Sequence, residues 1–309
     1  MSFALGIDAG GTETRWALAD ASGAIVAEGR SRGFSALQVR EIERPLVVAV
    51  LEELARAVLP IGSPRNVHAG LTGFGGDSEA LKNVIAMPFG LAPAAVSVGS
   101  DIETTFLDLF APGEGYVVYA GTGSVAAFVD ATGVLHRVGG RGVIIDDAGG
   151  GFWIGREALR HVWRAEEDEP GSWRSSALGT ELFAAIGGPD FAHTRRYVYE
   201  GSRGDVGMLA LAVARAADRD EIARTILRSA GTELARLARV MVRRYGPRPV
   251  ALTGRAATLH PLIAAAMRES LPPGTTLELR ECRGHHAAAH LALRAAGGRL
   301  HLAAGVSDG

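Results

Sequence analysis

The chain has 309 residues, 47% of them hydrophobic and 21% charged, and its formal net charge is −2. One hydrophobic core usually stops growing below this length, so two domains are expected. The nearly balanced charge argues against a nucleic-acid or membrane-surface partner, and the single cysteine, Cys282, excludes a disulfide or a cysteine-based metal cluster within one chain.

The N-terminal segment predicts a strand from Phe3 to Asp8 and lacks the basic and apolar regions of a secretion signal. No uncharged apolar stretch reaches the roughly 18 residues that a membrane helix needs. We therefore expect a cytoplasmic protein.

Two segments of the chain share one pattern of strand, glycine-rich turn, strand, short turn and strand. They run from Leu5 to Gly29 and from Val117 to Gly140. Each carries an Asp-x-Ser/Thr-Gly turn, at Asp20 and at Asp130, which is typical of a hairpin between apolar runs. The matched spacing predicts that the two halves arose by duplication.

Helices and strands are predicted to alternate after each repeat. The expected helices are 45–59, 77–85 (capped by Asp77), 102–110, 155–164, several between 176 and 245 with the longest starting near Asp220, 256–271, and 286–296, and the expected strands are 66–71, 95–98, 249–252 and 277–279. This order indicates an α/β protein with mixed sheets, in which the second half is larger.

The first glycine-rich turn is a candidate phosphate site. Gly10 and Gly11 let backbone N–H groups approach phosphate oxygens, and the hydroxyls of Thr12 and Thr14 can add donors. Asp8, which ends the first strand, can hold Mg²⁺ directly or through water. A plain hairpin turn explains the same residues.

The second repeat has a similar glycine-rich turn, formed by Gly121, Thr122, Gly123 and Ser124. Two such hairpins could clamp a polyphosphate. Each turn leads into a strand and not into a helix, so neither is a P-loop or a dinucleotide-binding fingerprint.

Three further positions attract attention. Asp101 follows a strand and could act as a general base, or simply cap the next helix. Asp146 and Asp147 precede a run of three glycines and could bind sugar hydroxyls or a metal, although turn chemistry also explains them. Gly254 follows a strand, where it allows a flat ligand to lie against the backbone or begins a helix.

These segments, in this order, resemble the actin-like ATPase superfamily, and within it the N-acetylglucosamine/glucosamine kinase branch of the BadF/BadG/BcrA/BcrD ATPases. The carrying segments are GIDAGGTETRWALAD (6–20), SDIETT (100–105), YAGTGSVA (119–126), GGRGVIIDDAGGGFWIGREAL (139–159) and ALTGRAATLHPLI (251–263). The resemblance covers most of the chain.

The resemblance implies two duplicated actin-like (ribonuclease H-like) domains, at residues 1–112 and 113–284, with a closing helix at 285–297 that joins the first. It implies an enzyme that uses ATP and Mg²⁺ to phosphorylate the 6-hydroxyl of N-acetylglucosamine or glucosamine. It also implies that this enzyme is a homodimer. The implied roles are Asp8 for Mg²⁺, Asp101 as base, Asp147, Gly140, Thr122 and Asp101 for the sugar, and Gly10, Gly11, Thr12, Thr14, Gly121, Thr122, Gly123, Ser124 and Gly254 for ATP.

Four residues depart from the family pattern: Ala36, Arg141 and Ala148 on the sugar side and Arg255 at the adenosine turn. The alternatives are therefore a kinase for another hexose or for N-acetylmuramic acid, or a non-catalytic nucleotide-binding sugar sensor or ATPase. An activator of a reductive dehydratase is disfavoured, because the single cysteine provides no partner for a shared cluster.

Three histidines, His285, His286 and His290, stand at the start of the closing helix and raise the question of a metal site. The helix is rich in alanine, and the sequence favours an ordinary structural role for these histidines.

Overall fold

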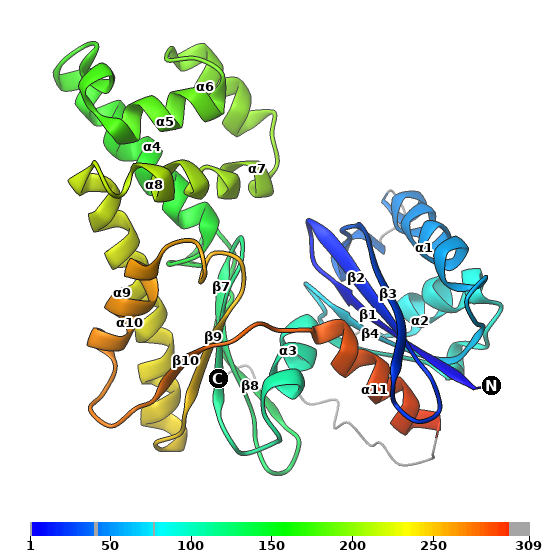
Figure 1. Ribbon diagram of the computed structural model, residues 1–309. Helices are drawn as coiled ribbons and strands as arrows, with labels where there is room; N and C mark the ends of the chain where they lie inside the picture. The colour runs from blue at the N-terminus through cyan, green and yellow to red at the C-terminus, as the bar shows by residue number, and fades with distance from the viewer. Residues whose placement is uncertain (1, 40–42, 77, 297–309) are drawn as a thin grey trace. The chain divides into compact units, whose positions relative to one another are not determined.

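The computed structural model describes residues 2–39, 43–76 and 78–296, which form two compact units (Figure 1). Of these described residues, those up to 113, those in 129–136 and those from 282 to 296 fall in the first unit, and residues 114–128 and 137–281 fall in the second.

The first unit contains a five-stranded sheet in the order β3-β2-β1-β4-β5. Its strands are β1 (Phe3–Ala9), β2 (Glu13–Ala19), β3 (Ile25–Arg32), β4 (Pro64–Leu71) and β5 (Val96–Ser100). The hairpin strands β1, β2 and β3 pair antiparallel, whereas β1, β4 and β5 run parallel. The carboxyl ends of three parallel strands therefore meet at one edge.

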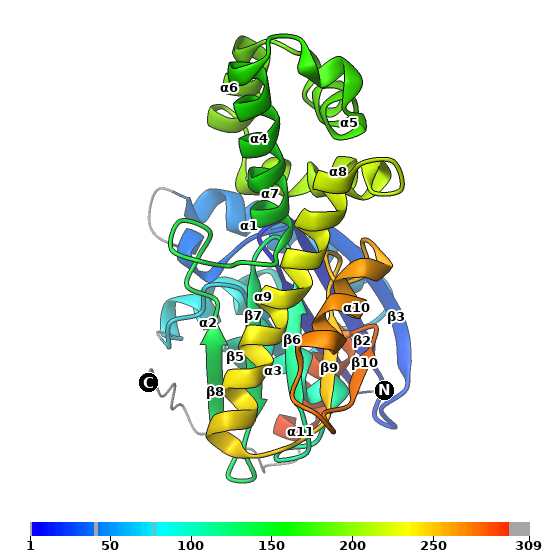
Figure 2. The same ribbon diagram turned by 90° about the vertical axis from the view of Figure 1, so that its left-hand side faces the viewer.

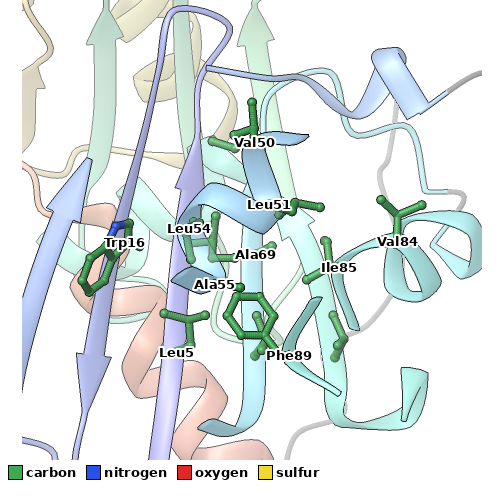
Figure 3. Close-up of a cluster of buried hydrophobic side chains, with 14 of the residues drawn as sticks. Leu5, Trp16, Val50, Leu51, Leu54, Ala55, Ala69, Val84, Ile85 and Phe89 are labelled. Atoms are coloured by element: carbon green, nitrogen blue, oxygen red, sulfur yellow. The ribbon is translucent and has the colours of Figure 1, made fainter. Parts of the chain in front are cut away.

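Helices cover both faces of this sheet, and the alternation of side chains along β1 decides what each face meets. Leu5 and Ile7 point into a core formed with α1 (Arg44–Val58) and α2 (Glu79–Ala86), part of which is drawn in Figure 3. Gly6 faces α11 (Gly284–Ala296), whose backbone comes so close that a Cβ at this glycine would overlap it.

Shorter helices complete the first unit. They are η1 (Ala36–Val39), η2 (Met87–Phe89), η3 (Pro93–Ala95) and α3 (Asp101–Leu109), the last of which packs beside α11. Helix α2 begins at Glu79, with Ser78 at its N-cap, whereas the predicted cap, Asp77, lies outside the described residues.

The second unit repeats the layout in a sheet of order β10-β9-β6-β7-β8. Its strands are β6 (Tyr116–Ala120), β7 (Ser124–Val129), β8 (Leu135–Gly139), β9 (Val250–Thr253) and β10 (Leu277–Leu279). In both sheets the first strand of the repeat is central, with its hairpin partner on one side and a later parallel strand on the other. This confirms the predicted α/β class with two mixed sheets.

The helices between β8 and β9, together with α10 between β9 and β10, make up much of the second unit. Figure 2 shows α9 and α10 in front of the sheet, with α4 to α8 extending beyond it. The bounds are α4 (Gly151–Asp168), η4 (Ser172–Ser175), α5 (Ala177–Ile186), α6 (Phe191–Tyr199), α7 (Arg203–Met208), α8 (Ala210–Ala216), α9 (Glu221–Tyr245) and α10 (Pro261–Ser270). Within the described ranges, no helix has the length and apolar character needed to cross a bilayer.

Two helix starts differ from the prediction by at least four residues. Helix α4 begins four residues earlier, at Gly151, because its first N–H groups bond to a hairpin that is distant in sequence. Helix α10 begins at Pro261 and not near Ala256, because His260 accepts a hydrogen bond from Leu262 N (3.2 Å) and Pro261 suits the first helical position.

Candidate active site

In the first unit, the parallel register brings two predicted carboxylates to one sheet edge. Ala9 lies opposite Leu71, which in turn lies opposite Ser100. Asp8 and Asp101 therefore flank this line of strand ends, where ligands of open α/β sheets commonly bind. Gly70 lies between them on β4, and a Cβ there would lie 2.6 Å from Thr104 Oγ1 and 3.3 Å from the Cα of Asp101. The missing side chain lets the start of α3 pack closely against β4.

The electrostatic setting of Asp8 is unusual for an aspartate. Burial, and then the negative charge of Asp101, raise its pKa to about 7, although Arg15 acts in the opposite direction. Its Oδ2 lies beside Gly284, where an added Cβ would be 2.9 Å away. A carboxylate whose ionised form is disfavoured in this way is suited to gain a cation.

Asp101 is the first residue of α3 and not its N-cap, which is Ser100. Its Oδ1 accepts a hydrogen bond from Ile102 N (2.8 Å), so the side chain is anchored to the first turn of the helix. Asp101 therefore does not cap α3, and its carboxylate is held at the start of this helix.

The first hairpin shows which glycine the protein fold requires and which it does not. Gly10 donates to Glu13 O (3.0 Å) in the turn. Gly11 has a φ that any residue adopts, and no atom lies within 4 Å of where its Cβ would be. Thr12 is exposed, but Thr14 is fully buried and its Oγ1 has no hydrogen-bond partner among the described residues. As placed, Thr14 cannot reach a ligand on the surface.

The segment that follows β3 packs against this hairpin. Gly33 donates to Thr12 O (3.3 Å), and a Cβ at Gly33 would lie 2.5 Å from Gly10 O. Ala36, where the family pattern has another residue, bonds through its N–H to Thr72 O (3.0 Å). Residues 33–36, which include the predicted sugar-side position Ala36, therefore adjoin the predicted phosphate hairpin within one unit.

In the second unit, the hairpin between β6 and β7 is closed by a bond from Gly121 N to Gly123 O (2.9 Å). Thr122 at its tip is half-buried, whereas Ser124 is 4% exposed and its hydroxyl donates to Ala148 O (2.7 Å). The hydroxyl of Ser124 thus supports the loop that carries Asp147. Gly140, another predicted sugar contact, donates to Ser124 O (2.9 Å).

Asp147 is the one described non-glycine residue with a positive φ, at 52°. Its Oδ1 accepts from Gly142 N (3.1 Å), and Oδ2 occupies the space where Gly123 would carry a side chain. Burial raises the pKa of this carboxyl group. Backbone strain and a buried carboxylate at one residue are typical of a functional position.

Its neighbour has a different setting, since Asp146 forms an ion pair with Arg236 of α9 (2.8 Å). Of the two adjacent acids, Asp147 therefore lies at the hairpin, and Asp146 is tied to a helix.

The three glycines after Asp147 have a packing role that their sequence does not reveal. Gly151 N and Phe152 N, at the start of α4, donate to the carbonyl groups of Gly121 (2.8 Å) and Thr122 (2.9 Å). A Cβ at Gly150 would lie 2.6 Å from the backbone of Gly123. The glycine run therefore lets α4 begin directly on the hairpin and fixes its shape.

Gly254 also lies at this hairpin. It has a φ of +100°, and the position of its Cβ is taken by the backbone of Ala120. Close packing therefore accounts for this glycine in the absence of any ligand, and the neighbouring Arg255 is exposed.

Sequence reasoning missed the glycines that make room at the carboxyl edge, Gly70 and Gly284. Nothing in their local sequence distinguishes them from turn glycines, because their neighbours come from other elements. A signal was available only for Gly70, a small residue inside an otherwise apolar strand, which often marks close backbone approach.

Comparison with known proteins identifies relatives of the whole chain. The profile of the BadF/BadG/BcrA/BcrD ATPase family matches residues 5–272. A glucosamine kinase of Vibrio cholerae is 27% identical over 171 residues, which are 54% of this chain. The match spans 56% of the length of that relative.

Solved structures extend the likeness to nearly the full length. A protein named as an N-acetylglucosamine kinase from Chromobacterium violaceum has a TM-score of 0.74 and 25% identity, covering 95% of this chain and 99% of that one. A similarly named protein from Porphyromonas gingivalis has a TM-score of 0.73 at 17% identity, covering 94% and 99%. A glucokinase from Streptomyces griseus has a TM-score of 0.60 at 15% identity, covering 95% and 100%. The last two show the shared fold alone.

Proposed function

This chain belongs to the BadF/BadG/BcrA/BcrD ATPase family, and we propose that it is a kinase that transfers a phosphoryl group from ATP to the 6-hydroxyl of an amino sugar, N-acetylglucosamine or glucosamine. The observation that carries the proposal is the carboxyl edge of the first unit, where Asp8 and Asp101 lie on either side of the end of β4, beside a glycine-rich hairpin. The printed names of the relatives from Vibrio cholerae and Chromobacterium violaceum support the substrate class.

In this proposal Asp101 is the general base. Its Oδ1 accepts a hydrogen bond from Ile102 N, which anchors the side chain. The carboxylate is proposed to accept the proton of the sugar hydroxyl as the hydroxyl oxygen attacks phosphorus. General-base help of this kind contributes about 10²–10⁴-fold to the rate.

Asp8 is the residue proposed to hold Mg²⁺. The fit is chemical, because a carboxylate with a raised pKa at an acidic strand edge favours a hard divalent cation with oxygen ligands. When bound, Mg²⁺ neutralises charge that develops on the phosphate oxygens.

The two hairpins are proposed to hold ATP through backbone N–H groups, with Thr12 and Thr122 adding hydroxyl donors. In the second unit, Asp147 and Gly140 are proposed to contact the sugar and Gly254 the adenosine. The buried hydroxyls of Thr14 and Ser124 would act indirectly, by packing and by supporting the loop of Asp147.

Gly11 offers a direct test of the phosphate role. Gly11→Ala should leave the thermal unfolding temperature within about 2 °C, because neither its φ nor any neighbouring atom opposes a Cβ. We expect a rise of roughly tenfold or more in the KM for ATP, since the methyl group would occupy the approach of a phosphate to the backbone.

The matched control is Gly75→Ala, another glycine with an ordinary φ and no atom within 4 Å of its Cβ position. It should change neither the unfolding temperature nor the KM for ATP. Equal KM values for Gly11→Ala and the unchanged protein would remove the first hairpin from the phosphate site.

A coupled ADP-release assay with Mg·ATP tests the function itself. The panel contains glucosamine, N-acetylglucosamine, N-acetylmuramic acid, N-acetylmannosamine, glucose and no sugar. Release that depends on glucosamine or N-acetylglucosamine supports the proposal. Preference for another sugar would indicate that Ala36, Arg141 and Ala148 form a pocket of different sugar specificity. ADP release without sugar would indicate an ATPase, and no release would indicate a nucleotide-binding sensor.

The resemblance also implies a homodimer working in the cytoplasm. Sedimentation analysis of the purified full chain measures the oligomeric state directly. A monomer at all assay concentrations would contradict the proposed homodimer.

A further inference from the structure

We propose that Glu28, His285 and His286 form a binding site for a transition-metal ion of the zinc type, on the first unit between β3 and the start of α11. One ligand atom from each of these three residues lies within 4.8 Å of the other two. The inference does not depend on the kinase function.

The fold brings these residues together from positions more than 250 residues apart. Glu28 lies opposite Ala17 in the antiparallel pair of β2 and β3, so both side chains emerge on the same face of the sheet. Ala17 packs against Ala289 of α11, which identifies this as the face that α11 covers. The carboxylate of Glu28 therefore extends from β3 towards the first turn of that helix.

Close packing fixes the helix end of the site. The backbone of α11 at His285, Ala288 and Ala289 fills the space above Gly6, leaving no room for a Cβ at that glycine. The first turn of α11 is thus held against β1, and the two imidazole rings lie 4.5 Å apart, centroid to centroid, in an edge-on arrangement.

Both imidazoles converge on one carboxylate oxygen. The Nε2 atoms of His286 and His285 lie 2.5 Å and 3.4 Å from the same oxygen, Oε2 of Glu28. His285 is only 7% exposed, and its Nδ1 has no hydrogen-bond partner among the residues that the structure describes. Two ring nitrogens and a carboxylate oxygen thus converge on one point, as the ligands of a metal ion do. The unpartnered Nδ1 of His285 is a second observation, because buried polar atoms usually have a hydrogen-bond partner.

The donor set indicates the class of metal. Two imidazole nitrogens and one carboxylate oxygen match the preferences of Zn²⁺, whereas Mg²⁺ prefers oxygen ligands alone. The side chain of Glu28 is 57% exposed, which leaves space for water to complete the coordination.

His290 on the same helix provides the contrast. Its Nε2 lies 3.0 Å from the carbonyl oxygen of Gly23, and it does not belong to the cluster. The three histidines that the sequence groups together are therefore divided by the structure into two potential ligands and one residue that contacts a turn.

The test is an isothermal titration calorimetry experiment, in which Zn²⁺ is added to the full chain after a chelator has removed any bound metal. We expect Zn²⁺ to bind at this site in the presence of excess Mg²⁺. Glu28→Gln and His286→Gln should each weaken binding by at least about tenfold, the loss that even an outer-shell partner can cause. Glu28 is largely exposed and His286 is half-buried, and glutamine can replace either without leaving a charge. Circular dichroism checks that both variants fold.

His290→Gln is the matched control, and it should bind Zn²⁺ as the unchanged protein does. Substitution by Co²⁺ gives a second readout, since visible absorption bands should appear with the unchanged protein and with His290→Gln, and weaken with His286→Gln. Binding rather than activity is measured, because Gly284 on the same turn adjoins Asp8. Absence of Zn²⁺ binding, or equal affinity after Glu28→Gln and His286→Gln, would overturn the proposal.

Discussion

Replacing Asp101 by asparagine should lower kcat with the preferred sugar by about 10²–10⁴-fold, the range that a general base contributes. Asparagine has the same shape and can still accept the hydrogen bond from Ile102 N, so α3 should form as before. What is lost is the ability to take the proton of the sugar hydroxyl. Steady-state kinetics with saturating Mg·ATP measures the effect, and fluorescence titration should give an ATP affinity within about threefold of the unchanged protein, a difference below 1 kcal/mol.

The matched control for this loss is Glu103→Gln, on the same helix two residues later. Glu103 is another carboxyl group with a pKa raised by burial, and it lies beside Gly99 and hydrogen-bonds the backbone of Ser100. No role in proton transfer is proposed for it. Its turnover should stay close to that of the unchanged protein. Turnover by Asp101→Asn within about threefold of the unchanged protein would remove Asp101 from the role of base.

Replacing Asp8 by asparagine should have opposite effects on activity and stability. Turnover should fall by ~10²-fold or more, because the proposed ligand of Mg²⁺ is lost together with electrostatic stabilisation worth several kcal/mol. The thermal unfolding temperature at pH 8 should rise by a few degrees, since asparagine carries no charge to bury. Such a trade-off is common at active sites.

The pH dependence of the Asp8 effect has a defined sign. Its folded-state pKa is about 7, against 3.8 for an unperturbed aspartate, so the folded chain holds this proton more tightly than the unfolded chain. The contribution of Asp8 to stability is therefore fully present below about pH 4 and is lost as the pH rises to about 7. The gain from Asp8→Asn should be largest at pH 8 and shrink at pH 5.

Differential scanning fluorimetry at the two pH values measures this change. Asp20→Asn is the comparison variant, because the pKa of Asp20 is shifted in the opposite direction from that of Asp8. Hydrogen bonds from Ser22 lower it. That variant should gain no stability at pH 8. An unfolding temperature for Asp8→Asn that does not rise at pH 8, or turnover that survives, would contradict the assignment.

The duplicated halves use the same hairpin in different ways. In the first unit, Gly11 faces open space and the nearby carboxylates lie at strand ends. In the second, the hairpin carbonyls are bound by the start of α4, and Asp147 fills the space beside Gly123. The two units therefore have similar hairpins, and the elements that pack against each hairpin make their environments different.

The sequence by itself determined the order and type of most elements and the duplication. Apolar periodicity and turn residues act locally, which is why the strands around Asp8 and Val117 and the helix after Asp220 could be predicted. It also placed Asp8 and Asp101 at the ends of strands, where side chains can meet a ligand.

Only the tertiary structure decided which of these residues meet. The register that aligns Ala9 with Leu71 and Ser100 depends on pairing between strands far apart in the chain, and no local pattern encodes it. The same holds for the burial of Thr14 and for the meeting of Glu28 with His285 and His286. That meeting depends on α11 packing closely over Gly6, where a Cβ would not fit.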